Sequence, residues 1–259
     1  MLQEWYWALS ASVLDQAKPL GYARDAARYR GIWTRNAEAW RGHLEACRAF
    51  ILRSARSAAG HGVAVVAGSG WCLDVPLEEL SRLFVNVVLV DVAHPLEVRR
   101  RAARLGNVRL LHADLTGSLS AVLESLKSGV RLPNRFVPVD PLPGVSPDIT
   151  ISANALARLP LLPMERLWTA GRHSEGELEA FARNAMQAHL DWLESRPGVR
   201  CLLTELAWLG VADNETMMSD PLHGVASPAP QERWEWSYAP RPEAHPLRDV
   251  VHVIGATVF

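Results

Sequence analysis

Two glycines and an acidic residue, each placed at the end of a short apolar run, are the residues of this chain best suited to bind a ligand. The run from Val63 to Ala67 leads into Gly68, Ser69 and Gly70, and a second run ends at Asp91, at the spacing of about 20 residues seen in nucleotide-binding folds. Glycine allows a sharp turn and a close approach of ligand to backbone. A carboxylate at the end of the next strand can accept hydrogen bonds from ribose hydroxyls. The spacing therefore predicts a nucleoside-binding site.

The segments around this site alternate between strand and helix patterns. Five short apolar runs are expected as strands: residues 63–67, the run that ends at Asp91, and residues 108–111, 148–153 and 199–204. Amphipathic helices are expected between them, among them 118–127 and a helix opened by the capping box Ser174 and Glu177. Such alternation is typical of a doubly wound, mostly parallel α/β sheet.

The end of the chain departs from this alternation. Trp234, Trp236 and Tyr238 alternate with polar residues, and a last apolar run extends from Val250 to Phe259. Because no helix separates the two runs, they are expected to form an antiparallel hairpin. Residues 129–147 and 209–231 lack periodicity and contain several prolines, so both are predicted as loops.

Residues 1–59 are predicted to form a helical extension in front of a sheet domain at 60–259. Within the extension Trp33, Trp40, Leu44 and Ile51 fall on one apolar stripe. In one interpretation this stripe packs the extension onto the sheet domain. In the other, aromatic residues of the extension cover a ligand as a lid: Trp5, Tyr6, Trp7, Tyr22, Tyr29 and Trp33.

With this order of elements, the region from about Gly60 to Phe259 resembles the class I, Rossmann-like S-adenosylmethionine-dependent methyltransferases. The resemblance rests on four places, which are Ala67–Gly70, Asp91, Ala113–Asp114 and Ser152–Asn154. It implies that S-adenosyl-L-methionine is the cofactor and that the protein is a methyltransferase.

The resemblance also implies a role for each place. The turn Ala67, Gly68, Ser69 and Gly70 would pass beneath the methionine part of the cofactor, and Asp91 would hold the ribose. The remaining cofactor-binding residues would read the adenine or lie beneath the reacting methyl group: Ala113 and Asp114 for the first, Ser152 and Asn154 for the second.

Two departures from the family's pattern leave other functions open. Cys72 stands where the family has a third glycine, and Ala155 and Leu156 follow Asn154 in place of Pro-Pro-aromatic. A non-catalytic binding or scaffold protein with the same fold is one alternative. An NAD(P)-dependent oxidoreductase is another, although Leu73 replaces the glycine that its fingerprint requires.

Methyl transfer from a sulfonium is an in-line displacement that needs alignment and the exclusion of water. A general base is needed only when the acceptor must first lose a proton. His112, Glu205 and His223 are the candidate catalytic residues, and each can equally be an ordinary hydrogen-bonded side chain.

Two further features have structural interpretations. Asp74, ahead of Pro76, is expected to cap the helix that follows the glycine turn, and a role in ligand binding is the alternative. Four arginines are expected on the solvated face of the next helix, with a phosphate or RNA patch as the alternative: Arg99, Arg100, Arg101 and Arg104.

The amino-acid composition limits the kinds of partner that the protein is expected to bind. With 27 basic and 28 acidic side chains the net charge is −1, so no overall field attracts a long nucleic acid or a membrane surface. A small-molecule or protein methyl acceptor is expected. Three widely separated cysteines predict neither a metal site nor disulfides, and no signal peptide or membrane span is seen, so a cytoplasmic location is expected. The oligomeric state stays open.

Overall fold

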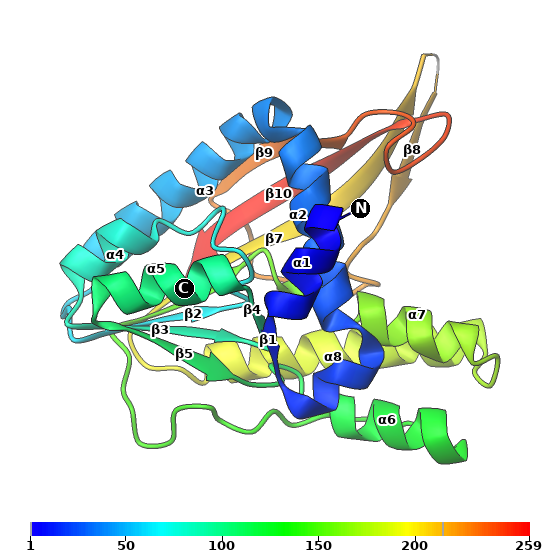
Figure 1. Ribbon diagram of the computed structural model, residues 1–259, viewed down its shortest axis with the longest axis horizontal. Helices are drawn as coiled ribbons and strands as arrows, with labels where there is room; N and C mark the ends of the chain where they lie inside the picture. Colours follow the sequence, from blue (N-terminus) through cyan, green and yellow to red (C-terminus); the bar gives the residue numbers. More distant parts are fainter. Residues whose placement is uncertain (1, 214) are drawn as a thin grey trace.

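An eight-stranded sheet runs through the protein, with helices on both faces (Figure 1). The computed structural model describes residues 2–213 and 215–259, so that Met1 of the predicted extension and Asn214 lie outside the described part. Seven strands follow the order β5-β3-β2-β6-β7-β10-β9, and β8 pairs with β7. The strands are β2 (Val63–Ala67), β3 (Asn86–Asp91), β5 (Val108–His112), β6 (Ile149–Ala153), β7 (Val199–Ala212), β8 (Glu215–Ser219), β9 (Glu232–Ala239) and β10 (Asp249–Val258).

The predicted fold class is confirmed. Strands β5, β3, β2, β6 and β7 are parallel, and β10 lies antiparallel between β7 and β9. The chain reverses direction between β9 and β10 without a crossover helix, which is why the last strand pairs antiparallel to its neighbours.

The helices cover the two faces of the sheet because alternate side chains of the central strands are apolar on both sides. One face packs against α3 (Ala37–Arg56), α4 (Leu77–Leu83) and α5 (Leu96–Leu105). The other packs against α8 (Glu175–Glu194), which is flanked by α6 (Leu119–Ser128) and α7 (Leu161–Thr169). The predicted capping box of α8 is confirmed, since Ser174 and Glu177 each bond the other's backbone N–H.

The N-terminal segment is in contact with the sheet domain at several places. It comprises α1 (Leu2–Ser10), β1 (Ser12–Val13), η1 (Asp15–Leu20) and α2 (Tyr22–Arg35), followed by α3. Strand β1 pairs with β4 (Ala93–His94), directly after β3. The predicted apolar stripe is divided between α2 and α3 at Asn36, and Trp40 of α3 packs edge-on against Trp236 of β9 at 4.6 Å. The division into 1–59 and 60–259 stays a prediction.

The prediction of a loop over residues 209–231 is wrong in part. Strand β7 continues beyond residue 204 to Ala212, and β8 turns back along it to form a projecting hairpin (Figure 1). All side chains of β8 are exposed, so its sequence carries no apolar alternation that could have revealed a strand.

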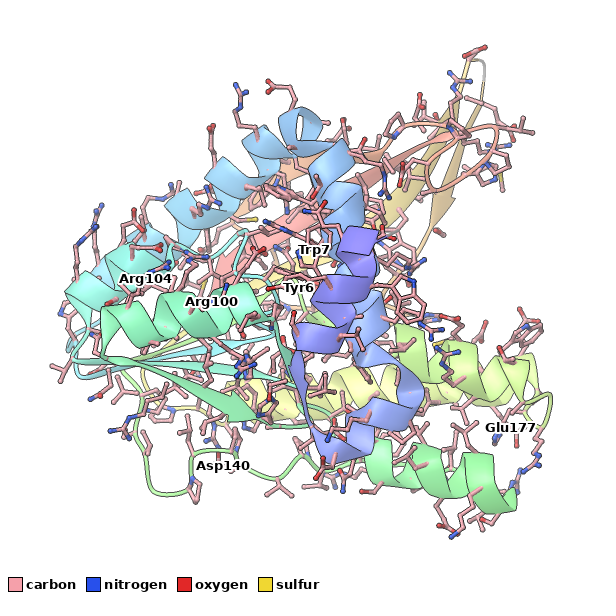
Figure 2. All side chains as sticks on the ribbon, viewed as in Figure 1. Tyr6, Trp7, Arg100, Arg104, Asp140 and Glu177 are labelled. Carbon is pink, nitrogen blue, oxygen red and sulfur yellow. The ribbon has the colours of Figure 1, made fainter. Side chains whose placement is uncertain are left out.

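Three of the four arginines expected on the solvated face of α5 are exposed: Arg99, and also Arg100 and Arg104, which are labelled in Figure 2. Arg101 on the same helix instead pairs with Glu78 at 2.7 Å. In the part of the chain that the structure describes, no helix combines the length and the apolar composition needed to cross a membrane.

Candidate functional site

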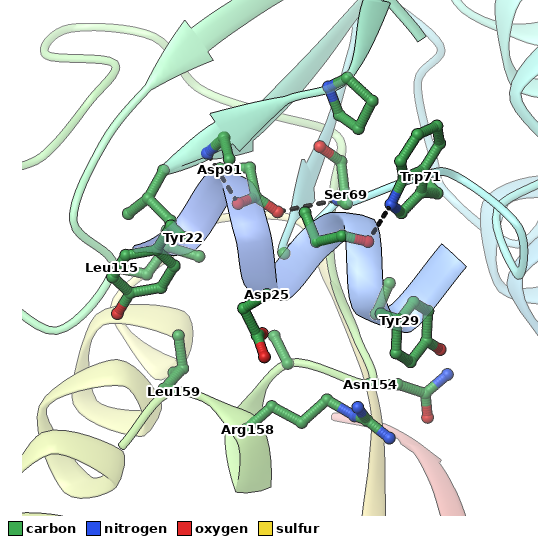
Figure 3. A pocket seen from close by; sticks show the side chains of 18 of the residues that line it. Tyr22, Asp25, Tyr29, Ser69, Trp71, Asp91, Leu115, Asn154, Arg158 and Leu159 are labelled. Atoms are coloured by element: carbon green, nitrogen blue, oxygen red, sulfur yellow. Dashed lines mark hydrogen bonds between the residues drawn. The ribbon is translucent and has the colours of Figure 1, made fainter. Parts of the chain in front are cut away.

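A cavity of about 200 Å³ opens at the carboxyl ends of β2, β3, β5 and β6, beneath helix α2 (Figure 3). This edge is where open α/β sheets bind their ligands, because the loops that follow neighbouring parallel strands meet there. Six of the predicted cofactor-binding residues contribute to its lining: Gly68, Ser69, Gly70, Asp91, Asp114 and Asn154. This cavity is called the first cavity below.

The glycine turn forms the floor of the first cavity. Gly68 has a φ of +72°, and a Cβ on it would lie 2.3 Å from the Cβ of Ala155, so the position accepts no side chain. Cys72 also adopts a left-handed conformation, with a φ of +50°, where the resembled family has its third glycine. Its side chain is buried in the core beside α4, and it is not among the residues that line the cavity. The departure at Cys72 therefore does not fill the site.

Asp91 closes this turn from the end of β3. Its Oδ2 accepts the N–H of Gly70 at 2.8 Å, and its Oδ1 accepts the N–H of Ala93 at 3.1 Å. Each carboxylate oxygen has two acceptor positions, so one on each remains for a ligand. Asp91 does not cap the following helix, because α5 begins after Pro95 and receives no cap from the described side chains.

Asp114 follows β5 and orders the start of α6. Its Oδ1 accepts from the backbone N–H of Thr116 at 2.9 Å, and its Oδ2 accepts from that of Leu119 at 2.8 Å. It lines the first cavity as well, on the side of β5. The same carboxylate thus fixes the loop and faces the site.

The other three predicted cofactor-binding residues lie behind this lining. Ala67 is buried in the core and Ala113 packs against it. Ser152 is fully buried, and its Oγ lies 2.9 Å from Nε2 of His189 on α8. Their assignment as binding residues stays a prediction.

Asn154, which is buried, and Asp74, which is half-buried, form a hydrogen-bonded pair at the β6 side of the cavity. Asn154 has a φ of +48°, a conformation that asparagine tolerates better than most residues. Its Nδ2 donates to Oδ2 of Asp74 at 2.6 Å and to Sγ of Cys47 at 3.4 Å. Its buried Oδ1 has no hydrogen-bond partner among the described residues. Burial raises the pKa of Asp74 above its ordinary value, while the bond from Asn154 lowers it.

The predicted capping role of Asp74 is wrong. Helix α4 begins at Leu77 with Pro76 in the capping position, and no side chain caps it. Asp74 turns instead toward Asn154 and the cavity. The position of Asp74 shortly before the helix favoured a capping role, but its hydrogen bond with Asn154, 80 residues away, determines where its side chain points.

Arg158 lies at the end of the cavity closest to β7. Its Nε donates to Oε1 of Glu205 at 2.8 Å, and Glu205 is completely buried. The guanidinium carbon lies 4.9 Å from the ring centre of Tyr29 and 5.5 Å from that of Tyr238. The carboxylate of Glu205 raises the pKa of Arg158, against the lowering effect of burial, so the arginine is charged.

Helix α2 covers the first cavity with Tyr22, Asp25 and Tyr29. It is fixed to the glycine turn because Nε1 of Trp71 donates to the backbone oxygen of Ala26 at 2.8 Å. In Figure 3, Tyr29, Asn154 and Arg158 lie on one side of the cavity and Tyr22 on the other.

Of the aromatic residues predicted to cover a ligand as a lid, Tyr22 and Tyr29 do line the cavity. The others are exposed or pack the extension onto the sheet domain. Trp5 and Tyr6 are exposed, whereas Trp7 packs behind Trp71 at 5.8 Å. Trp33 joins the apolar cluster around Trp40. None of these four aromatic residues appears among the described residues that line the cavity.

The first cavity is acidic. Among the described residues that line it, four are carboxylates and one is a guanidinium: Asp25, Asp74, Asp91, Asp114 and Arg158. The pKa of Tyr22 is raised first by burial and then by the charges of Asp114, Asp91 and Asp25. The site therefore favours a ligand with positive charge.

None of the three candidate bases lies in the lining of the first cavity. His112 is exposed, with Nε2 3.1 Å from the backbone oxygen of Ser12. His223 lies half-buried in a turn at a φ of +50°. Glu205 is held by Arg158. Their catalytic assignment stays a prediction.

Sequence reasoning missed Asp25 and Arg158 as site residues, and for Asp74 it preferred the capping role to the alternative of ligand binding. Arg158 had no local signal, because it lies on the short turn η2 (Leu156–Arg158) and meets Glu205 only in the folded protein. Asp25 lies on α2, one helical turn from the aromatic residues Tyr22 and Tyr29, and this spacing could have indicated it.

No protein-family model matches this sequence, and no curated protein matches it. Among solved structures, 1,6-didemethyltoxoflavin-N1-methyltransferase of Burkholderia thailandensis, with 1,6-didemethyltoxoflavin and S-adenosylhomocysteine, is 17% identical. The match covers 88% of this chain and 82% of that one, with a TM-score of 0.37. A SAM-dependent methyltransferase of Leishmania major is 14% identical, covering 98% and 81%, with a TM-score of 0.31. Phosphoethanolamine N-methyltransferase 1 of Haemonchus contortus is 13% identical, covering 89% and 49%, with a TM-score of 0.33.

Proposed function

We propose that this protein binds S-adenosyl-L-methionine in the first cavity and transfers its methyl group to a small-molecule or protein acceptor. The observation that carries the proposal is the charge of the lining, four carboxylates against one guanidinium among the described residues. S-adenosylmethionine carries a sulfonium, an ammonium and one carboxylate, so its net charge is positive and complements this lining.

The same observation argues against a dinucleotide. The pyrophosphate of NAD(P) is negative and is normally held at the N-terminus of the helix that follows the glycine turn. Here α4 starts only at Leu77, well beyond Gly70, and its first residues are not among those that line the cavity. A pyrophosphate at this edge would instead face the carboxylates of Asp91 and Asp114.

The residues present fit the parts of the cofactor. Asp91 and Asp114 would accept hydrogen bonds from the ribose hydroxyls and the adenine amino group. The glycine turn leaves room for the methionine part, and the unpartnered Oδ1 of Asn154 would accept a bond from its ammonium group. The bound sulfonium supplies an activated methyl group.

The chain's own contribution to the reaction is alignment and exclusion of water. Tyr22 and Tyr29 on α2 cover the cavity, and the bond from Trp71 to Ala26 holds that cover in place. Keeping water out strengthens the electrostatic interactions inside the site and prevents hydrolysis. Arg158 stands where the first cavity meets the space over β7, β9 and β10, so the acceptor would approach from that side.

The test is calorimetric titration of the purified protein with S-adenosylmethionine, S-adenosylhomocysteine and NADH. Micromolar binding of the two sulfur nucleosides and none of NADH is expected. Binding of NADH alone would replace the proposal by an oxidoreductase. Binding of the nucleosides without turnover on any acceptor pool would favour a non-catalytic binding or scaffold protein, and binding of none of them would refute the cofactor assignment.

A further inference from the structure

A second cavity of about 280 Å³ continues from the first over strands β7, β9 and β10. The two share Tyr22, Asp25, Tyr29 and Arg158 in their linings, so they meet at these residues. The volume of the second cavity is close to the lower end of the roughly 300–1,000 Å³ typical of small-molecule sites. The position is that of an acceptor site beside a cofactor site.

Aromatic rings form one wall of the second cavity. His252 of β10 stacks on Tyr238 of β9 at 4.5 Å with an interplanar angle of 10°, and on Trp208 of β7 at 5.5 Å and 28°. His252 and Trp208 lie directly opposite each other in the β7–β10 pair, which keeps their side chains on one face of the sheet. Leu161, Leu162 and Ile32 add apolar surface. Rigid rings and aliphatic side chains together favour a flat, apolar ligand body.

Arg158 gives this apolar space one polar anchor at the junction. Its Nε donates to Glu205, and this is the one hydrogen bond that the guanidinium makes among the described residues, so both terminal nitrogens are left without an acceptor there. The guanidinium therefore presents a free pair of donors to an oxyanion. The other charged groups that line this cavity are Arg28, Asp25 and Glu165. Arg28 is exposed and pairs with Asp25 at 3.2 Å, and Glu165 is exposed, so among the described residues Arg158 is the cation with unpaired donors that lies deepest in the site.

The imidazoles nearby cannot remove a proton at neutral pH. Burial, and after it the charge of Arg158, lowers the pKa of His252 to about 2 and that of His43 to about 3. Nδ1 of His252, a side chain that is 5% exposed, has no hydrogen-bond partner among the described residues and lies 3.8 Å from Oε1 of Glu205. An acceptor that arrives already ionised needs no base.

We infer that the acceptor is a flat aromatic compound that binds in the second cavity through an ionised oxygen, a phenolate or an aromatic carboxylate, held by Arg158. The inference rests on the proposed function. In the transfer, a lone pair of that oxygen forms the new oxygen–carbon bond as the carbon–sulfur bond breaks, and the bonding electrons stay on sulfur. No proton moves in this step, because the acceptor lost its proton to solvent beforehand. The methylated product is neutral and loses its attraction to Arg158, which favours its release.

The test uses three probes of the same size that differ in charge: 4-nitrophenol, 4-nitrobenzoate and 4-nitroaniline. Each is titrated into the wild-type protein saturated with S-adenosylhomocysteine, below the pKa of free 4-nitrophenol. The inference predicts binding of nitrophenol and nitrobenzoate at least tenfold tighter than of nitroaniline. It also predicts that bound nitrophenol shows the visible absorption of its phenolate. Equal binding of all three probes, binding of none, or a bound nitrophenol that stays protonated would overturn the inference.

Variants then test whether Arg158 is the anchor. Arg158→Gln together with Glu205→Gln removes both charges of the pair and avoids leaving a buried carboxylate alone. Its affinity for the two anions should fall about ten- to a hundredfold, with nitroaniline unchanged. The matched control is Arg24→Gln, an exposed arginine on α2 that is not part of either lining. An equal loss in the control, or none in the double variant, would also overturn the inference.

The two proposals can fail separately. S-adenosylhomocysteine that does not bind refutes the proposed function and this inference with it. If S-adenosylhomocysteine binds but the three probes bind with affinities that do not depend on their charge, only the proposed class of acceptor is refuted.

Discussion

Replacing Asp91 by asparagine removes one negative charge from the first cavity with almost no change in side-chain shape. An amide oxygen is a weaker acceptor than a carboxylate, and the amide NH₂ cannot accept at all. Hydrogen bonds to charged groups contribute about 1.5–3 kcal/mol. The dissociation constant for S-adenosylhomocysteine should therefore increase about ten- to a hundredfold.

The same change also affects the fold, because both oxygens of Asp91 accept backbone N–H groups, from Gly70 and Ala93. At least one of these bonds is lost in asparagine, at a cost of about 1–3 kcal/mol in the free energy of unfolding. A loss of affinity could then reflect a loosened turn, so a control with the same chemistry is needed.

Asp220 provides that control. Its carboxylate accepts the backbone N–H groups of Leu222 at 2.8 Å and Gly224 at 2.7 Å, and it is not among the residues that line either cavity. Asp220→Asn should lower stability to a similar extent in urea unfolding and leave calorimetric affinity for S-adenosylhomocysteine unchanged. If Asp91→Asn binds as tightly as the wild type, Asp91 does not hold the ligand.

Three further predictions concern stability. Arg158→Met should lower the free energy of unfolding by about 3 kcal/mol because it leaves Glu205 buried and unpaired, and adding Glu205→Gln should recover part of this in a urea double-mutant cycle. Gly106→Ala should lower the free energy of unfolding by about 1–2 kcal/mol because of its φ of +78° alone. Gly68→Ala should lower it further and abolish nucleoside binding, because a Cβ at Gly68 would also lie 2.3 Å from the Cβ of Ala155. Equal losses in the two variants would contradict this steric explanation. His252 has a pKa of about 2 in the folded protein and is neutral there between pH 7 and pH 5, whereas in the unfolded chain it becomes protonated near its ordinary pKa of about 6.5. The free energy of unfolding should therefore decrease as the pH is lowered from 7 to 5. In urea unfolding, His252→Phe should lose about 2 kcal/mol less than the wild type over this range.

The parts of the site that could be predicted from the sequence are those fixed by neighbouring residues. The strand, glycine turn and acid at Asp91 are read from apolar runs and glycine spacing, and Gly68 and Gly70 do line the cavity. The reversed last strand followed from the alternation of Trp234 and Trp236 without an intervening helix. The sequence pattern was sufficient to predict these features because the conformation of each depends on residues that are close together in the chain.

The residues that escaped prediction depend on long-range contacts. Asp74 satisfies the spacing of a helix cap, yet it bonds Asn154, 80 residues away. Arg158 acquires its role from Glu205 on β7, 47 residues away. The buried environment that holds such pairs together exists only after the sheet has formed.

The most direct test of the account is a crystal structure of the protein with S-adenosylhomocysteine. We expect the adenosine in the first cavity between Asp91 and Asp114, with the ribose hydroxyls on Asp91 and the sulfur toward Asn154 and Arg158. A nucleoside bound elsewhere, or in the first cavity without contact to Asp91, would contradict the account.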